Sequence, residues 1–177
     1  MIINIIVLLL SLSIILFWGI PSIVSLFYGA PWVPTPKKVA ERMIKLAKLK
    51  KGDVVYDLGS GYGRILIYAA KRCDIQAVGI EIDPIKCLIS RLLVWICQQH
   101  KKVRIINGNF FKKDLSSSDV VFCYLLQQTN IKLMDKLKRE LKPGARIVSH
   151  SFTFPSWKVI KKDKNKFIYL YIAGESY

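Results

Sequence analysis

The sequence predicts an α/β fold: a Rossmann-like, doubly wound and mostly parallel sheet, preceded by an N-terminal transmembrane helix. Three observations support this prediction. Short apolar runs alternate with runs of helical periodicity from residue 37 to residue 150, which is typical of a parallel sheet covered by helices. Gly59, Gly61 and Gly63 form a turn after the first apolar run. The first 36 of the 177 residues carry no charged side chain.

The uncharged N-terminal segment has the length of a membrane span. Residues 2–27 are almost continuously Ile, Leu, Val, Ser and aromatic, and about 20 apolar residues cross a bilayer as a helix. A cleaved signal peptide would have a basic start and a shorter apolar core, and a buried core helix would show a polar face. We therefore expect a transmembrane anchor over residues 1–29, followed by a proline-rich linker over residues 30–36.

The charge of the chain lies entirely after this segment. All 28 basic and 12 acidic residues follow residue 36, which gives the predicted domain, residues 37–177, a net charge of +16. Basic residues directly after a span predict a single-pass membrane protein with its domain on the cytoplasmic side, or the matrix side of a mitochondrion. The positive electrostatic field of a domain with this net charge attracts anionic partners. Beside an anchor we expect an anionic membrane surface, and we expect no nucleic acid.

Each further element is placed by its periodicity and its end signals. Thr35 is expected to cap a helix that begins at Pro36, and Asp83 to cap a helix that begins at Pro84. Strands are expected at 54–58, 76–81, 103–106, 119–124 and 146–150, and helices at 36–49, 62–71, 84–98 and 128–141. A hairpin of residues 157–160 and 167–172 would add an antiparallel edge.

Acidic residues at two strand ends indicate the cofactor. A dinucleotide-binding turn would read G-x-G-x-x-G, whereas here the third glycine comes one residue early and Asp57 precedes the turn. A carboxylate repels a diphosphate but attracts the ammonium and sulfonium groups of S-adenosylmethionine (SAM). Glu81, at the tip of the next strand, can accept hydrogen bonds from both ribose hydroxyls. A merely structural turn would not require these acids, so the sequence predicts a SAM site.

These motifs resemble those of a known enzyme class. Residues 57–63 look like the first motif of class I SAM-dependent methyltransferases, Glu81 like the second, and residues 107–110 like the adenine-contacting loop. Residues 33–36 and 148–152 more narrowly resemble the archaeal and mitochondrial protein lysine methyltransferases. The mitochondrial members are anchored by a hydrophobic N-terminal segment and modify the c-ring protein of ATP synthase or the adenine nucleotide translocase.

The resemblance implies a set of cofactor-binding residues. They are Thr35, Asp57, Gly59, Ser60, Gly61, Gly63, Glu81, Ile82, Asn109 and Phe110. Glu81 would accept from the ribose, and Asp57 with the neighbouring glycine backbone would hold the methionine end. Asn109 stands where family members usually have an acid, but its amide carbonyl can still accept from the adenine amino group. Residues 33–36 would cover the cofactor.

An apolar substrate channel is expected beside the cofactor. Its residues would be Trp32, Val33, Pro34, Tyr124, Phe152, Phe154 and Trp157, although core packing is the alternative for any one aromatic. The fourth strand ends without the Asp/Asn-Pro-Pro-aromatic tetrad that is typical of nucleobase methylation. An apolar channel next to a sulfonium favours the neutral lysine amine, so no dedicated base is required. If a general base takes part, Tyr124 and His150 are the candidates. No metal site is expected, because the four cysteines lack ligand spacing.

We therefore predict a membrane-anchored SAM-dependent methyltransferase that acts on lysine side chains of membrane-associated proteins. Two alternatives stay open. The acceptor could be a membrane-embedded small molecule, such as a quinone precursor or a lipid, for which an enclosing substrate subdomain would be expected. The chain could also be a non-catalytic SAM-binding scaffold, which intact Asp57 and Glu81 do not exclude.

Overall fold

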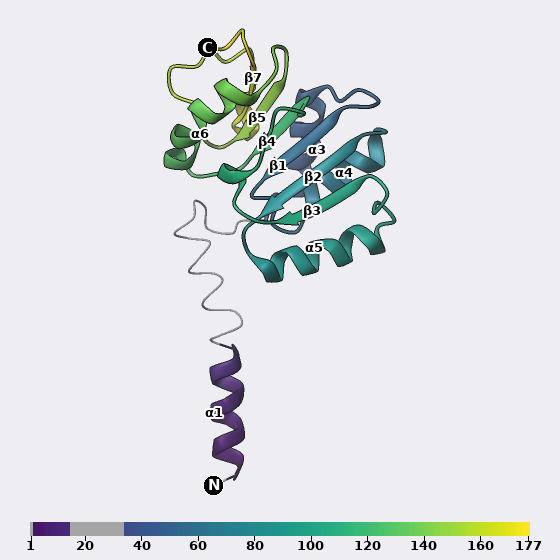
Figure 1. Ribbon diagram of the computed structural model, residues 1–177, viewed down its shortest axis with the longest axis vertical. Coiled ribbons are helices and arrows are strands. Elements are labelled where there is room, and N and C mark those ends of the chain that lie inside the picture. The colour runs from purple at the N-terminus through teal and green to yellow at the C-terminus, as the bar shows by residue number, and fades with distance from the viewer. Residues whose placement is uncertain (1, 15–33) are drawn as a thin grey trace.

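A seven-stranded sheet forms the centre of the computed structural model, which describes residues 2–14 and 34–177 (Figure 1). The strand order is β3-β2-β1-β4-β5-β7-β6. The strands are β1 Val54–Leu58, β2 Gln76–Glu81, β3 Val103–Asn107, β4 Val120–Cys123, β5 Arg146–His150, β6 Lys161–Asp163 and β7 Ile168–Ile172. β1 to β5 pair in parallel, and β7 is antiparallel to both β5 and β6. The predicted doubly wound, mostly parallel sheet is confirmed.

Helices cover both faces of the sheet and enclose two apolar cores. The described helices are α1 Ile2–Ile14, α3 Lys37–Ala47, α4 Arg64–Arg72, α5 Pro84–Ile96 and α6 Gln127–Glu140, with 3-10 turns η2 Phe110–Lys112 and η3 Lys164–Lys166. The buried faces of α3, α4 and α5 pack in one core, and α6 packs with the C-terminal residues in the other. Apolar residues at helical spacing therefore decide which face each helix turns to the sheet.

The prediction of an N-terminal transmembrane helix is wrong. α1 has 13 residues, and a rise of about 1.5 Å per residue makes it roughly 20 Å long, against a hydrocarbon core of about 30 Å. Within residues 2–14 and 34–177, no helix is both long and apolar enough to cross a membrane. The single-pass membrane location was inferred from that helix, so this prediction is wrong as well. Most of the expected linker, residues 30–33, lies outside the described residues.

The ends of the predicted elements were right where a side chain caps them. Asp83 caps α5 as expected, because its carboxylate accepts from the N–H groups of Ile85 at 2.9 Å and Lys86 at 3.2 Å. Thr35 does not cap α3. Pro36 is the N-cap residue, and α3 begins one residue later than expected. The C-terminal hairpin exists, but its first strand is β6 rather than residues 157–160.

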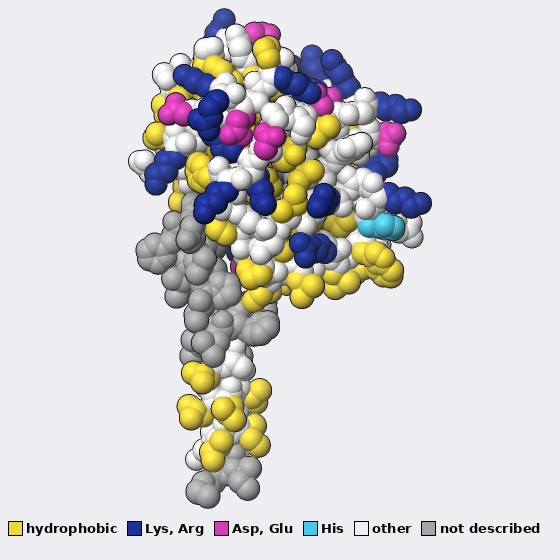
Figure 2. Space-filling model, viewed as in Figure 1, with side chains coloured by type: hydrophobic (Ala, Val, Ile, Leu, Met, Phe, Trp, Pro, Cys, Tyr) yellow, Lys and Arg dark blue, Asp and Glu magenta, His cyan; other side chains and the backbone are white. Residues whose placement is uncertain are grey.

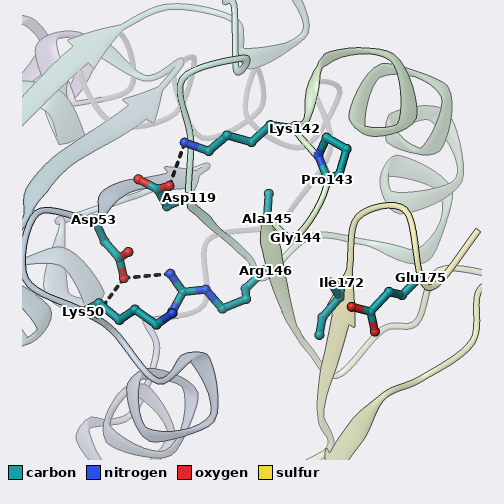
Figure 3. A pocket seen from close by; sticks show the side chains of 10 residues that line it. All are labelled: Lys50, Asp53, Asp119, Lys142, Pro143, Gly144, Ala145, Arg146, Ile172 and Glu175. Atoms are coloured by element: carbon teal, nitrogen blue, oxygen red, sulfur yellow. Dashed lines mark hydrogen bonds and ion pairs between the residues drawn. The ribbon is translucent and has the colours of Figure 1, made fainter.

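The sheet has two functionally different edges. Arg146 at the start of β5 donates to the carbonyls of Ala47 and Lys48 at the end of α3 and to Asp53 just before β1. Lys142 pairs with Asp119 just before β4, at 2.6 Å. Arg146, Asp53, Lys142 and Asp119 line a pocket of about 410 Å³ at the amino edge of the parallel strands (Figure 3). The three-glycine turn lies at the opposite, carboxyl edge.

Basic side chains outnumber acidic ones in the domain, 28 to 12. Lys and Arg outnumber Asp and Glu on the face shown in Figure 2. An apolar row follows the outer side of α5, where four large side chains are 57–68% exposed. They are Leu88, Leu92, Trp95 and Ile96. A domain with this charge is expected to associate with acidic rather than basic partners.

Candidate cofactor and substrate site

The candidate site lies where the direction of the strand order reverses. β1 stands between β2 and β4, so successive connections leave it toward opposite sides of the sheet. In open α/β sheets the ligand-binding crevice forms at the carboxyl ends of the strands beside this switch point. The turn after β1 and the residues after β4 meet there: a Cβ on Gly59 would lie 3.1 Å from Leu125 Cδ2.

The three-glycine turn requires its glycines for conformation and for space. Gly59, Gly61 and Gly63 have φ values of 75°, 53° and 69°, the left-handed region that other residues rarely adopt. A Cβ on Gly63 would also stand 2.6 Å from the Ser90 Oγ atom. α4 begins directly after the turn, with Gly63 as its N-cap. The backbone is therefore bare where a ligand would approach it.

Glu81 ties this turn to the second strand. Its side chain is 6% exposed, and one carboxylate oxygen accepts from the Gly61 N–H at 2.8 Å. The other oxygen accepts from the Asp83 N–H at 3.0 Å. A carboxylate offers about four lone-pair directions, so two remain for the hydroxyls of a ribose. The main-chain donors fix the orientation of the acid in advance.

Asp57 is a buried acid whose charge lacks compensation. It is 4% exposed, and burial together with the nearby Glu81 charge raises its pKa to about 7. In the described part of the chain no Lys, Arg or His forms an ion pair with it. A cationic ligand group would stabilise the ionised carboxylate. The ammonium and sulfonium groups of SAM therefore fit the residues that are present.

Asn109 and Phe110, which follow β3, are held by a hydrogen bond and by core packing respectively. The Asn109 carbonyl oxygen accepts from the Phe111 N–H at 2.9 Å, which leaves one lone pair and the amide N–H groups for a ligand. Phe110 is 8% exposed and packs in the core with Leu58 and Ile80. Ile82 and Ser60 lie beside Glu81 and Gly61 in the chain, half-buried and buried respectively.

The sequence analysis placed Asn107 only in the adenine-contacting loop and missed its bonds beside Glu81. Its amide N–H group donates to the carbonyls of Glu81 and Ile82, at 3.0 Å each. It stands directly opposite Glu81 in the parallel pairing of β2 and β3. Its position as the last, polar residue of a strand beside an acidic strand end is the signal that could have identified it.

Two candidate catalytic side chains meet at the ends of β4 and β5. The rings of Tyr124 and His150 are 4.2 Å apart between centroids. His150 is 8% exposed, and burial lowers its pKa, which the nearby main chain of Lys166 partly offsets. Its Nδ1 atom is buried, with no hydrogen-bond partner among the residues described. Burial therefore favours the neutral imidazole.

The described residues of the predicted channel differ in their burial. Trp32 and Val33 lie outside the described residues. Pro34 is exposed and Thr35 half-buried, just before α3, and Phe152 is half-buried after β5.

Two of the predicted channel aromatics are core residues. Phe154 is 1% exposed and Trp157 is 6% exposed, and their rings stack at 4.8 Å. Both also contact the ring of Tyr171 edge-on. Core packing, the alternative considered for them, accounts for both.

The chain is similar to proteins of known kinds. Residues 57–161 match the ANTKMT methyltransferase domain. A protein-lysine N-methyltransferase of Saccharolobus islandicus (strain REY15A) is 42% identical over 152 residues, which cover 82% of this chain and 94% of that protein. The adenine nucleotide translocase lysine N-methyltransferase of Mus musculus is 33% identical over 131 residues, 73% of this chain but 56% of that protein.

A solved structure has the same fold with a ligand bound. It is the crystal structure of an RNA methyltransferase from Salinibacter ruber in complex with S-adenosyl-L-homocysteine. It is 38% identical, has a TM-score of 0.79, and the match covers 82% of this chain and 96% of that one. The ligand in that structure is the product that SAM leaves after giving up its methyl group.

Proposed function

The chain belongs to the family of the ANTKMT methyltransferase domain and is a SAM-dependent methyltransferase, and from this premise we propose that it methylates lysine side chains of proteins. The observation that carries the proposal is the 42% identity to a protein-lysine N-methyltransferase over 94% of that protein's length. SAM supplies an electrophilic methyl group on a sulfonium. The residues of this chain bind, orient and desolvate the reacting groups.

Glu81 and Asp57 would hold the two polar parts of the cofactor. Glu81, already fixed by two main-chain N–H groups, keeps two lone-pair directions for the ribose hydroxyls. Asp57 and the bare backbone of Gly59 and Gly61 would hold the methionine end, where a positive charge lowers the pKa of the buried acid. Ser60 and Gly63 complete the turn and its packing against α5. Both acids would thus bind the cofactor through their negatively charged carboxylates.

Asn109 and Phe110 would bound the adenine, with Ile82 beside the ribose. The Asn109 carbonyl oxygen, half used by the Phe111 N–H, can accept from the adenine amino group. Phe110 is largely buried, so only the edge of its ring would be available. Thr35 and Pro34 would cover the methionine end from the side of α3.

The substrate lysine would enter between the ends of β4 and β5. A lysine amine must be neutral to attack, yet its solution pKa is about 10.4. Apolar side chains such as Leu125 and the ring of Tyr124, together with a neighbouring cation, both favour the neutral amine. Alignment of this amine with the methyl group then contributes much of the rate. His150 and Tyr124 would shape the entrance rather than act as a base.

RNA is the second acceptor that an observation favours. The Salinibacter ruber protein is named an RNA methyltransferase, and this chain carries a net charge of +16. Against RNA, Tyr124 is followed by two leucines, where nucleobase methylation typically uses a Pro-Pro-aromatic sequence. A small-molecule acceptor is disfavoured because the described residues 151–160, between β5 and β6, form no helix that could enclose it.

Transfer from labelled SAM distinguishes these acceptors. The purified chain is incubated with methyl-tritiated SAM and a cell extract, which is then separated into protein, RNA and lipid. We expect the label in protein, and as methyl-lysine after acid hydrolysis. Label in RNA or lipid alone would contradict the proposal, and binding of SAM without transfer to any fraction would indicate a scaffold. A Glu81→Ala variant, expected to lose cofactor affinity, is the control for background transfer.

A further inference from the structure

The tip of the C-terminal hairpin stands beside the substrate entrance. Ile168 of β7 pairs with Asp163 of β6 on one side and with His150 of β5 on the other. Residues 164–167, which connect β6 to β7, therefore project past the carboxyl edge of the sheet. The His150 ring lies close enough to the main chain of Lys166 to raise its pKa slightly against the effect of burial. The Ser151 N–H donates to the carbonyl of Phe167 at 2.8 Å. The tip is thus fastened to the end of β5, next to Tyr124.

Both residues of this hydrogen bond adopt an unfavourable backbone conformation. Ser151 has a φ of 64° and Phe167 a φ of 51°, in the left-handed region. For an aromatic residue this conformation is costly and persists only where its surroundings enforce it. Phe167 is nevertheless 61% exposed, so its side chain gains little from packing. A strained, exposed aromatic beside a reaction site indicates a binding function.

Four lysines lie on the tip or at the start of α3 and form what we call the basic rim: Lys164, Lys166, Lys37 and Lys38. α3 runs antiparallel to β5, since its end is bound to Arg146 at the amino edge. Arg42 of α3 pairs with Asp163 at 2.7 Å, which sets α3 beside the hairpin. Lys38 lies one helical turn before Arg42, on the same side, and hence toward the tip.

The charge of the rim is uncompensated. Asp163 is the acid next to the tip, and Arg42 holds its pKa below the ordinary value and neutralises its charge. Glu41 pairs instead with Arg72 of α4. No rim lysine forms an ion pair with any acid in residues 34–177. The rim is therefore a positive surface that would attract an anionic partner.

We propose that the basic rim binds an acidic segment of the protein substrate, close to the lysine that is methylated. This rests on the proposed function. Three strand spacings of about 4.8 Å separate β1 from β7, which places the rim roughly 15 Å from the glycine turn. An extended peptide advances about 3.3 Å per residue, so acids about four to six positions from the target lysine would reach it.

Two other occupants fit less well. A second copy of the chain is repelled, because each copy carries a net charge of +16. Single-stranded nucleic acid is usually bound by several aromatic side chains that stack on successive bases. Among the described residues of the tip, 164–167, Phe167 is the one aromatic. An acidic peptide needs only the charges and one apolar contact.

Charge reversal at the rim tests the proposal. The test uses fluorescent peptides that carry one lysine and, on either side of it, three glutamates at positions four to six. They are compared with peptides in which glutamine replaces each glutamate. The variant K164E/K166E is compared with K71E/K101E, which changes the net charge equally at exposed positions toward the amino edge. We expect the first variant to bind the acidic peptide about 10-fold more weakly at low salt and the second to bind like the unchanged protein.

The outcomes separate this proposal from the proposed function. Equal binding of acidic and glutamine peptides, or equal loss in both variants, would overturn the rim as a docking site. Tighter binding of a polyadenylate oligonucleotide than of the acidic peptide, lost in K164E/K166E, would make the partner a nucleic acid instead. Anisotropy measures binding without turnover, so failure of methyl transfer contradicts only the proposed function. Unchanged affinity for S-adenosylhomocysteine shows that the variants are folded.

Discussion

The carboxylate of Glu81 accepts a hydrogen bond from the main-chain N–H of Gly61, at 2.8 Å. Two sequence motifs twenty residues apart are therefore one structural unit. The acid at the end of β2 holds the turn after β1 in shape, and the same carboxylate has lone pairs left for a ribose. Loss of this side chain should affect both the turn and the cofactor.

We expect Glu81→Gln to weaken the binding of S-adenosylhomocysteine by roughly 10- to 100-fold. An amide has one acceptor oxygen, so its NH₂ group must face the N–H of Gly61 or Asp83, and one charge-assisted bond is lost. Titration calorimetry measures the affinity. Glu175→Gln, at the opposite edge of the sheet, should leave it unchanged. Equal affinity in Glu81→Gln would remove Glu81 from the cofactor site.

Asp57 should make the ligand-free protein less stable as the pH rises toward neutrality. Its pKa is about 7 in the folded chain against 3.8 ordinarily, so the unfolded chain releases this proton at lower pH. Folding therefore favours the protonated acid, and its contribution is complete below about pH 4 and lost as the pH passes 7. The whole contribution is at most roughly 4 kcal/mol.

Urea denaturation between pH 5 and pH 8 measures this effect. The free energy of unfolding should fall across the range in the unchanged protein and stay nearly level in Asp57→Asn, whose amide does not titrate. A parallel fall in both proteins would assign the pH dependence to other groups. The sign is opposite to that of Asp119 and Glu140, whose pKa values are lowered by their lysine partners.

The polar part of the candidate site could be predicted because it depends on topology. Parallel strands end at one edge, so the acids Asp57 and Glu81 had to meet there once the strands were identified. Asn107 was placed only in the adenine-contacting loop, because its bonds to Glu81 and Ile82 depend on the register of β3 against β2, which the sequence does not give. Phe154 and Trp157 were assigned to the channel, since an aromatic in a core and one in a channel look alike in a sequence.

The N-terminal prediction was wrong for a related physical reason. Hydropathy counts apolar residues but does not delimit a helix, and among the described residues the apolar helix α1 comprises only Ile2–Ile14. The hairpin was predicted from its turn residues, yet its first strand began too early. Trp157 stacks on Phe154 in the core, the Ile160 N–H donates to the Leu170 carbonyl at 2.9 Å, and strand pairing starts at Lys161.

Gly63→Ala should destabilise the protein more than Gly144→Ala. Both glycines have positive φ values, 69° and 84°, and each alanine should cost about 1 kcal/mol for conformation. A Cβ on Gly144 meets nothing within 4 Å, but one on Gly63 would lie 2.6 Å from Ser90 Oγ. We expect a further loss of about 1–3 kcal/mol, measured by urea denaturation. In the double variant Gly63→Ala/Ser90→Ala, part of this lost stability should be regained.

His150→Gln should lower kcat by less than about 10-fold, because the desolvated lysine needs no dedicated base. His150 is largely buried, and burial lowers its pKa, which makes the imidazole a weak proton acceptor. Rates from pH 6 to pH 9 with a peptide substrate provide the measurement, with Tyr124→Phe in parallel. A loss above 100-fold together with a missing acid limb would make His150 a base.

Arg146→Ala should reduce stability by about 2–4 kcal/mol while leaving cofactor affinity unchanged. The guanidinium joins three groups at the amino edge, the carbonyls of Ala47 and Lys48 and the Asp53 carboxylate at 2.8 Å, and is itself 15% exposed (Figure 3). Its loss leaves a buried acid without its partner, which costs far more than the loss of an exposed pair.

Lys142→Ala is the matched control at the same edge. Its ion pair with Asp119 is 2.6 Å long, but the lysine is 49% exposed, so we expect a loss below about 1 kcal/mol. Urea denaturation and calorimetry with S-adenosylhomocysteine measure both variants. If Arg146→Ala lowered the affinity as strongly as the stability, the amino edge would be coupled to the cofactor turn across the length of the strands. The separation of a structural edge from a chemical edge would then not hold.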